Sequence, residues 1–153
     1  GFDSPNYPKL GSIGEHIKIN DDLILKPANN EESPFYVHSQ MDPNVMDIGI
    51  FPGLNPKNLK RILSIPELKG IVLRTFGSGN APGDPGLLEA IESAVGDKKV
   101  ILNVTQCTEG MVEMGVYAAS SGLLERGVIS GLDMVPEAAL AKMMSIGKET
   151  VPM

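Results

Sequence analysis

Short apolar runs alternate with amphipathic stretches along the sequence from Phe35 onward. Two of the runs, 70–76 and 99–104, are almost continuously apolar, which is typical of strands buried on both faces of a parallel sheet. Strands are predicted at 45–51, 70–76, 99–104 and 128–130, and 35–39 is a further strand or its lead-in. Strands that alternate with helices in this way predict an α/β fold with about four parallel strands.

The stretches between these runs carry start and stop signals of helices. Asn55 precedes Pro56 and Asp84 precedes Pro85, and each pair combines an N-cap residue with a proline at the first helical position. Two further helices are predicted, one from about residue 111 to a stop at Gly127 and one that starts at Pro136. The apolar positions expected to face the core are Leu59, Ile62, Leu63, Leu87, Ile91, Ala94, Val95, Val112, Val116, Ala119, Leu123, Ala139, Leu140 and Met143. Helices on both faces of the sheet would give three layers.

Residues 1–34 differ from the rest because prolines, glycines and asparagines interrupt every apolar run. Only short runs remain, at 16–19 and 23–25. A segment of this kind predicts a linker or an arm that lies on another domain, and a frayed tail is the alternative. The division into domains is therefore predicted as an arm at 1–34 and an α/β domain at 35–153.

Composition excludes several classes of function. The 153 residues include 13 Lys and Arg against 19 Asp and Glu, a formal charge of −6 without a basic stripe, so a nucleic-acid partner is not expected. No apolar stretch approaches the roughly 20 residues of a membrane span, and the N-terminus does not resemble a signal peptide. The single cysteine, Cys107, indicates a reducing, cytoplasmic setting, and two histidines (His16 and His38) without cysteine partners argue against a structural zinc site.

Polar residues follow two of the predicted strands, at 74–80 and 103–108. Ligands of parallel sheets bind beyond the carboxyl ends of the strands, where these residues are expected. Arg74 offers a planar fork for a carboxylate, and Gly79 allows the backbone to approach a ligand closely. Such a set suits an amino acid or a similar small zwitterion. The alternatives are a surface ion pair for Arg74 and a small packing role for Cys107. A dinucleotide loop is excluded, because proline stands where the third glycine is needed.

Several stretches resemble one known family. The segments LRTFGSGNAPGD (73–84), NVTQCTEGMVEMGVYA (103–118) and GVISGLDMVPEAALAKM (127–143) closely resemble the C-terminal, Rossmann-like domain of type I (cytoplasmic) L-asparaginases. MDPNVMDIGIFPGL (41–54) resembles the strand and turn that enter this domain in the family. SPNYPKLGSIGEHI (4–17) resembles the stretch that follows the larger N-terminal domain.

The resemblance implies a function for the parent protein. Members of the family hydrolyse L-asparagine to L-aspartate and ammonia without a cofactor, using threonines of the N-terminal domain. No TGGT-like motif occurs in this sequence, so the chain by itself is expected to be inactive. Its expected partners are an N-terminal catalytic domain of the same protein and further subunits, in a homodimer or homotetramer.

The resemblance also implies an allosteric L-asparagine site between subunits. Arg74 would clamp the carboxylate of that ligand, and Asn80 and Thr105 would make polar contacts. Cys107 would pack closely against the ligand. The complete set of expected ligand-binding residues is Arg74, Gly79, Asn80, Thr105, Gln106 and Cys107. No metal ligand and no catalytic residue is expected in the chain.

Two other functions are compatible with the residues. One is a free-standing amino-acid-binding module, which would bind asparagine tightly as a monomer. The other is the asparaginase-like subunit of a tRNA-dependent amidotransferase, although the chain lacks the basic surface that tRNA would need. A purely structural domain, in which Arg74 contributes only to stability, is a further alternative.

Overall fold

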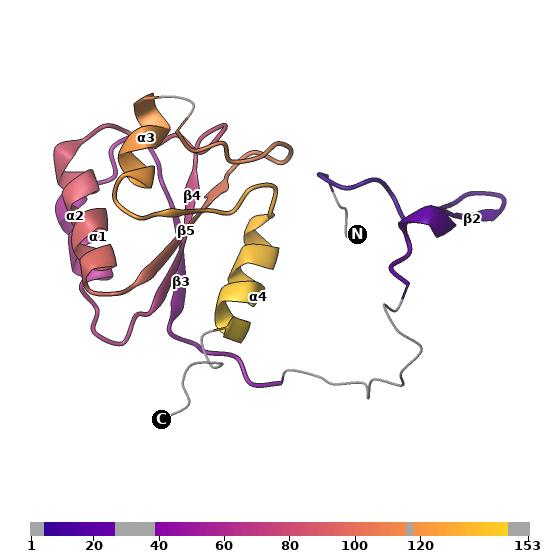
Figure 1. Ribbon diagram of the computed structural model, residues 1–153, viewed down its shortest axis with the longest axis horizontal. Coiled ribbons are helices and arrows are strands. Elements are labelled where there is room, and N and C mark those ends of the chain that lie inside the picture. Colours follow the sequence, from indigo (N-terminus) through magenta and orange to yellow (C-terminus); the bar gives the residue numbers. More distant parts are fainter. Residues whose placement is uncertain (1–4, 27–38, 116–117, 147–153) are drawn as a thin grey trace. The chain divides into compact units, whose positions relative to one another are not determined.

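The computed structural model describes residues 5–26, 39–115 and 118–146, and the chain divides into two units, 1–37 and 38–153. The larger unit contains a parallel sheet whose strands lie side by side in chain order. These strands are β3 (Val45–Gly49), β4 (Gly70–Thr75), β5 (Val100–Thr105) and β6 (Ile129–Ser130). The predicted α/β fold with four parallel strands is confirmed (Figure 1). The predicted strand or lead-in at 35–39 falls almost entirely outside the described residues.

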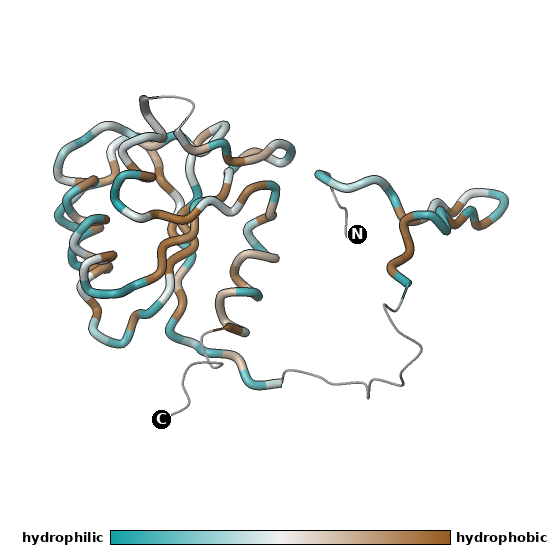
Figure 2. The backbone as a smooth tube through the Cα atoms, in the orientation of Figure 1, coloured by the Kyte–Doolittle hydropathy of each residue, from teal (hydrophilic) through white to brown (hydrophobic). Residues whose placement is uncertain are grey.

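The two central strands have the most apolar sequences, as their position requires. β4 pairs with β3 on one side and with β5 on the other, so both faces and both edges of β4 are covered. Along β4 and β5 the tube in Figure 2 is brown over most of its length, which marks the hydrophobic centre of the unit. Side chains of a strand alternate between the two faces. Leu73 therefore belongs to the core on one face of the sheet, and Val72 to the core on the other.

The first two helices begin where their caps predict. α1 (Pro56–Leu63) starts after Asn55, whose side-chain oxygen accepts a hydrogen bond from the backbone N–H of Lys57 at 2.9 Å. α2 (Pro85–Gly96) starts after Asp84, which accepts from the backbone N–H of Leu87 at 2.9 Å. Each cap satisfies one of the N–H groups that a helix start leaves without a partner.

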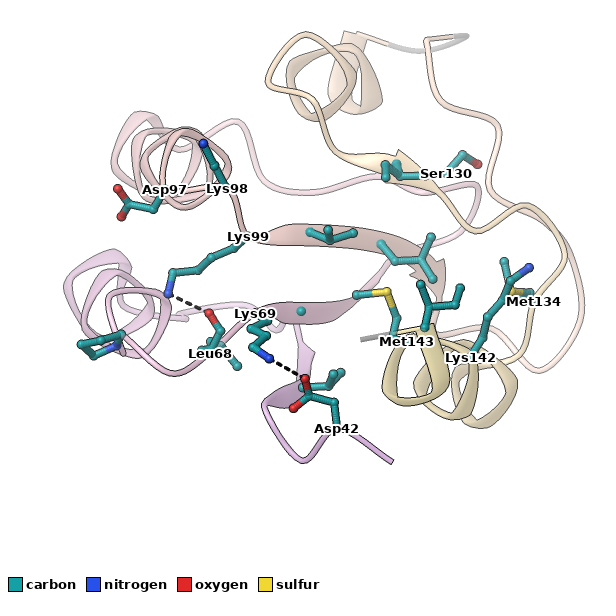
Figure 3. A pocket seen from close by; sticks show the side chains of 17 residues that line it. Asp42, Leu68, Lys69, Asp97, Lys98, Lys99, Ser130, Met134, Lys142 and Met143 are labelled. Carbon is teal, nitrogen blue, oxygen red and sulfur yellow. Dashed lines mark hydrogen bonds and ion pairs between the residues drawn. The ribbon is translucent and has the colours of Figure 1, made fainter. Parts of the chain in front are cut away.

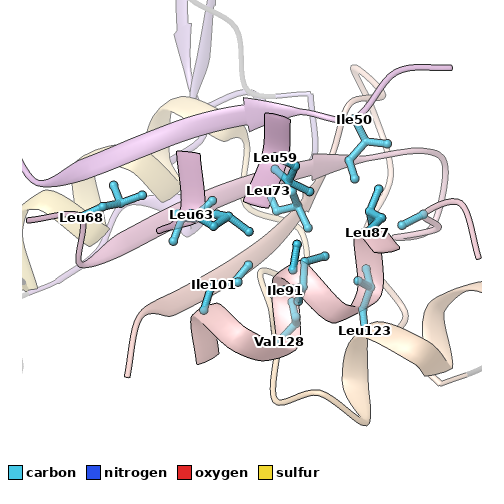
Figure 4. Packing of buried hydrophobic residues seen from close by; sticks show 14 residues of the cluster. Ile50, Leu59, Leu63, Leu68, Leu73, Leu87, Ile91, Ile101, Leu123 and Val128 are labelled. Atoms are coloured by element: carbon cyan, nitrogen blue, oxygen red, sulfur yellow. The ribbon is translucent and has the colours of Figure 1, made fainter. Parts of the chain in front are cut away.

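One face of the sheet is covered by α1, α2 and α3 (Ala118–Leu124). Figure 4 shows side chains from these helices meeting those of the strands in one cluster. Its fully or nearly fully buried members include Ile50, Leu59, Leu63, Leu68, Ile71, Leu73, Leu87, Ile91, Ile101, Leu123 and Val128.

The opposite face carries one described helix, α4 (Pro136–Ile146), as Figure 1 shows. The buried residues of this second core are Val72, Leu102, Val104 and Ala139, with Met134, Leu140 and Met143 packed against them. The backbone N–H of Asp42 donates to the carbonyl of Met144 at 2.8 Å, which ties the entry to β3 to the end of α4.

The prediction of a helix from about residue 111 is wrong at its beginning. Val112 is fully buried, but it lies in the loop between β5 and α3, and α3 begins only at Ala118. Gly110 and Gly115 in this loop adopt left-handed backbone conformations, with φ of 118° and 90°, which a helix does not accommodate. Val112 is buried through tertiary contacts rather than through a helical stripe. Val116 lies outside the described residues.

The smaller unit contains a hairpin that the sequence did not reveal. β1 (Gly11–Ile13) pairs antiparallel with β2 (Ile17–Ile19), and a short 3₁₀ turn, η1 (Asp21–Leu23), follows. The register places Ile13 opposite Ile17, and Ile19 on the same face, and all three side chains are exposed in this unit. An isolated two-stranded hairpin is marginally stable in water. An exposed apolar face of this kind suits contact with another surface.

Candidate functional site

The carboxyl ends of β4 and β5 lie next to each other and bring the two polar segments together. The register pairs Arg74 with Val104 and Thr75 with Thr105. The chain after β4 turns back tightly, because the backbone N–H groups of Gly79 and Asn80 both donate to the carbonyl of Phe76, at 3.1 and 2.8 Å. The candidate site is therefore built from two strand ends and one tight turn.

Arg74 is anchored by an acidic residue of the neighbouring strand. Its Nε donates to Oδ1 of Asp47 at 2.7 Å, and both side chains are about one third exposed. Asp47 is paired in register with Val72, so Arg74 lies diagonally across the strand pair on the same face. The guanidinium has five N–H donors, and the structure assigns only Nε a bond among the described residues. The four donors on the two terminal nitrogens have no hydrogen bond assigned among the described residues.

A glycine beside Arg74 leaves room for its side chain. Gly49 is the register partner of Arg74, and a Cβ atom built on Gly49 would lie 3.5 Å from Nη2 of Arg74. A larger residue at this position would contact the guanidinium through its side chain and restrict it. The end of β3 thus contributes both the anchor and the space for Arg74.

A buried polar cluster lies on the other face of the same strand ends. Asn103 is fully buried; its amide nitrogen donates to the carbonyl of Gly79 at 3.1 Å, and its oxygen accepts from the hydroxyl of Thr75 at 2.7 Å. These hydrogen bonds attach the turn that follows β4 to the neighbouring strand β5. Buried polar groups need such partners, because an unsatisfied one costs roughly 1–3 kcal/mol.

Gly79 and Asn80, in the turn after β4, have an unusual backbone conformation and an unusual hydrogen-bonding environment, respectively. Gly79 has a φ of 101°, and a Cβ atom there would lie 2.6 Å from Cγ1 of Val112. Its neighbour Asn80 has a buried side-chain oxygen without a hydrogen-bond partner among the described residues, while its amide nitrogen lies 3.5 Å from the hydroxyl of Ser78. The turn thus contains one buried acceptor without a partner among the described residues.

The segment after β5 is held mainly by its own side chains. Thr105 is buried, and its hydroxyl accepts from the backbone N–H of Cys107 at 3.0 Å. The amide nitrogen of Gln106 donates to the carbonyls of Ile50 and Arg74, at 2.6 and 3.0 Å, and so links three strand ends. Cys107 is exposed.

Strand alternation places two of the expected ligand-binding residues, Arg74 and Thr105, on opposite faces of the sheet. Arg74 lies on the face that carries Val72 and α4, whereas Thr105, the register partner of Thr75, lies on the face that carries Leu73. The site is thus an edge with two polar sides rather than one closed cavity. One side carries the guanidinium of Arg74, and the other carries the hydrogen-bonded pair of Thr75 and Asn103.

Comparison with known proteins identifies the family. The model of the glutaminase/asparaginase C-terminal domain matches residues 36–151. The chain belongs to this family. It is 41% identical to the 60 kDa lysophospholipase of Mus musculus over 142 residues, which cover 93% of the chain and 24% of that protein. It is 37% identical to L-asparaginase 1 of Escherichia coli (strain K12), covering 94% of the chain and 42% of that protein.

A solved structure agrees with this assignment. The crystal structure of L-asparaginase I from Vibrio cholerae superposes with a TM-score of 0.85 at 35% identity, covering 99% of the chain and 45% of that protein. The chain therefore spans less than half the length of each of these relatives. The predicted resemblance to the C-terminal domain of type I L-asparaginases is confirmed.

The sequence did not reveal several of the contacts that hold the carboxyl ends of β3, β4 and β5 together. Asp47 stands within an apolar strand, and its pairing with Arg74 depends on a register between residues 27 positions apart. An isolated acidic residue in an otherwise apolar strand was the available signal. Asn103 and Thr75 were recognised as polar strand-end residues, but their mutual hydrogen bond follows only from the pairing of β4 with β5.

Among residues 5–26, 39–115 and 118–146, no group of three or more His, Cys, Asp or Glu side chains is placed to hold a metal ion. Within the same ranges, no helix has the length and apolar character to cross a bilayer.

Proposed function

We propose that the chain is the C-terminal domain of an L-asparaginase, an amidohydrolase that converts L-asparagine and water to L-aspartate and ammonia. The observation that carries this proposal is the family match over residues 36–151, together with 37% identity to L-asparaginase 1 of Escherichia coli. The catalytic threonines belong to an N-terminal domain of the same cytoplasmic protein. The parent protein assembles as a homodimer or homotetramer.

The carboxyl edge of the sheet serves this protein as an allosteric site for L-asparagine. The terminal guanidinium nitrogens of Arg74 bind the α-carboxylate, since they are free to form a bidentate pair. The side-chain oxygen of Asn80 accepts a hydrogen bond from the ligand, because it has no partner in the described part of the chain. The neighbouring subunit supplies the remaining contacts.

The apolar face of the hairpin supports the presence of a larger partner surface. Ile13, Ile17 and Ile19 share this face and are exposed in their own unit. Burying them against an adjoining domain contributes roughly 1.5–3 kcal/mol for each side chain. The arm at residues 1–34 therefore contacts the N-terminal domain.

A kinetic experiment on the complete natural protein tests the allosteric role. The rate of ammonia release is measured against asparagine concentration, and a sigmoidal curve is expected. Arg74→Lys keeps the charge but loses the fork, so the concentration of half-activation is expected to rise about tenfold or more. Arg61→Lys, at an exposed position of α1, is the matched control and should leave the curve unchanged.

Distinct outcomes decide the two parts of the proposal. A higher concentration of half-activation in Arg74→Lys, with preserved maximal rate, supports an allosteric site. A hyperbolic curve for both proteins removes the allosteric role but leaves the asparaginase assignment intact. Absence of ammonia release from the natural protein, with hydrolysis of a lysophospholipid instead, overturns that assignment in favour of the activity named for the mouse relative.

Calorimetric titration separates the domain from a free-standing binding module. L-Asparagine, L-glutamine and L-aspartate are titrated into the 153-residue chain. Weak or absent binding is expected, because the proposed site is completed by another subunit. Tight binding of asparagine by the monomeric chain would instead assign it to an amino-acid-binding module.

A further inference from the structure

The charges of the parallel sheet are concentrated in one ion pair. Its four described strands contain two charged residues, Asp47 of β3 and Arg74 of β4. The two meet, because Nε of Arg74 donates to Oδ1 of Asp47 at 2.7 Å, and their side chains are 32% and 39% exposed. An ion pair with this exposure contributes little to stability.

A buried ion pair of the same unit shows a different bonding pattern. Asp42 is buried, and its Oδ1 accepts hydrogen bonds from the backbone N–H and from the side-chain amide of Asn44. Its Oδ2 accepts from the ammonium group of Lys69 at 2.7 Å, as Figure 3 shows. Both oxygens of Asp42 thus have partners within the fold. Asp47 is assigned one bond, through Oδ1, and its Oδ2 has no partner among the described residues.

Arg74 is also incompletely bonded. It contacts Asp47 through Nε, and its four terminal N–H donors have no hydrogen bond assigned in the described part of the chain. Gly49, its register partner, leaves the space beside Nη2 without a side chain, since a Cβ atom there would lie 3.5 Å from Nη2. A simple anion is attracted by Arg74 but repelled by Asp47, and a simple cation meets the reverse. A ligand with both charges on neighbouring groups matches the pair.

We propose that Asp47 and Arg74 together bind a free α-amino acid, with Oδ2 of Asp47 accepting a hydrogen bond from its α-ammonium group. This role of Asp47 rests on the proposed function, in which Arg74 binds the α-carboxylate of L-asparagine, and it adds a second ligand-binding residue to that site. The ammonium group of an α-amino acid is bonded to the carbon next to the carboxylate. Asp47 lies on the Nε side of the guanidinium, so the ligand's carboxylate takes the terminal nitrogens while its ammonium group turns towards Oδ2. The pair therefore selects α-amino acids over carboxylic acids that lack the ammonium group.

Removal of the negative charge from Asp47 in the complete natural protein tests this contact. Asp47→Asn keeps an oxygen that accepts from Nε of Arg74, but it binds an ammonium group less strongly. The rate of L-aspartate formation is measured against L-asparagine concentration, and the concentration of half-activation is expected to rise about tenfold or more. Glu125→Gln removes the same charge from an exposed position directly after α3, and this matched control should leave the curve unchanged.

Succinamate separates binding of the ammonium group from mere orientation of Arg74. It keeps the carboxylate and the amide of asparagine but lacks the ammonium group, and its hydrolysis does not yield L-aspartate. At a low, fixed asparagine concentration, activation of the natural protein is expected to need about tenfold or more succinamate than additional asparagine. In Asp47→Asn this difference is expected to disappear, because asparagine binding weakens while succinamate binding does not.

The possible failures are distinguishable. A difference between the two ligands that persists in Asp47→Asn overturns the ammonium contact, because Asp47 then only orients Arg74. An unchanged asparagine curve in Asp47→Asn also overturns it, whereas a shifted curve in Arg74→Lys would leave the proposed allosteric site intact. A hyperbolic curve for the natural protein removes that site and the ammonium contact together.

Discussion

Gly79 holds the turn after β4 in a conformation that other residues adopt only with strain. Its φ is 101°, and a Cβ atom would lie 2.6 Å from a methyl carbon of the buried Val112. Gly79→Ala is therefore expected to lower the free energy of unfolding by about 1–3 kcal/mol. Urea denaturation at equilibrium measures this loss.

A neighbouring glycine provides the control for this substitution. A Cβ atom on Gly83 would have no atom within 4 Å, and its φ lies outside the left-handed region. Gly83→Ala is expected to change the free energy of unfolding by no more than about 0.5 kcal/mol. Equal losses in the two variants would show that the contact with Val112 does not constrain the turn.

The positions of single residues at the carboxyl edge of the sheet were predictable where the signal is local. Arg74 and Asn80 stand at a strand end and in a glycine-rich turn, and both features are visible in a short stretch of sequence. The partners of Arg74 and of the turn at Gly79 were not predictable. Asp47 and Asn103 act through pairs 27 and 24 positions apart along the chain, and only the strand register defines those pairs.

At the scale of a single element, the start of α2 depends on the side chain of Asp84. Asp84 accepts a hydrogen bond from the backbone N–H of Leu87, and its carboxylate lies at the positive end of the helix. Asp84→Ala is expected to destabilise the domain by about 1 kcal/mol. Asp97→Ala, at the other end of α2, removes a carboxylate from the negative end and should be neutral or slightly stabilising. Thermal unfolding of both variants distinguishes the loss of the N-cap hydrogen bond from a general effect of removing a negative charge.

Helices with a cap and a proline were predicted with correct starts, because both signals act within one turn. The start of α3 was not, because Val112 fits a helical stripe in sequence although it is buried in a loop. That loop is shaped by left-handed glycines and by a backbone hydrogen bond from Val112 to Leu132. Contacts between residues distant in sequence therefore bury Val112, although its spacing in the sequence is typical of a helix.

At the scale of the whole molecule, the parallel sheet was predictable because its central strands are apolar on both faces. The hairpin β1–β2 was not, because its strands have three residues each and bury none of them within their own unit.

Asp42 links the stability of the larger unit to pH. Its buried carboxylate accepts hydrogen bonds from Lys69 and from the backbone N–H of Asn44, and these interactions lower its pKa below the ordinary value. The unfolded chain therefore binds this proton at a higher pH than the folded chain does. The stabilisation is complete above the ordinary pKa of about 3.9 and is lost as the pH falls through it towards the folded value.

Asp42→Asn is accordingly expected to be less stable than the unchanged protein at pH 7, and the difference should shrink below about pH 4. Chemical denaturation across this range, repeated in a Lys69→Met background, measures both effects. Because Lys69 is the largest cause of the lowered pKa, the pH dependence of the difference should be smaller in that background. A difference that stays constant with pH would show that Asp42 acts through its hydrogen-bond geometry and not through its charge.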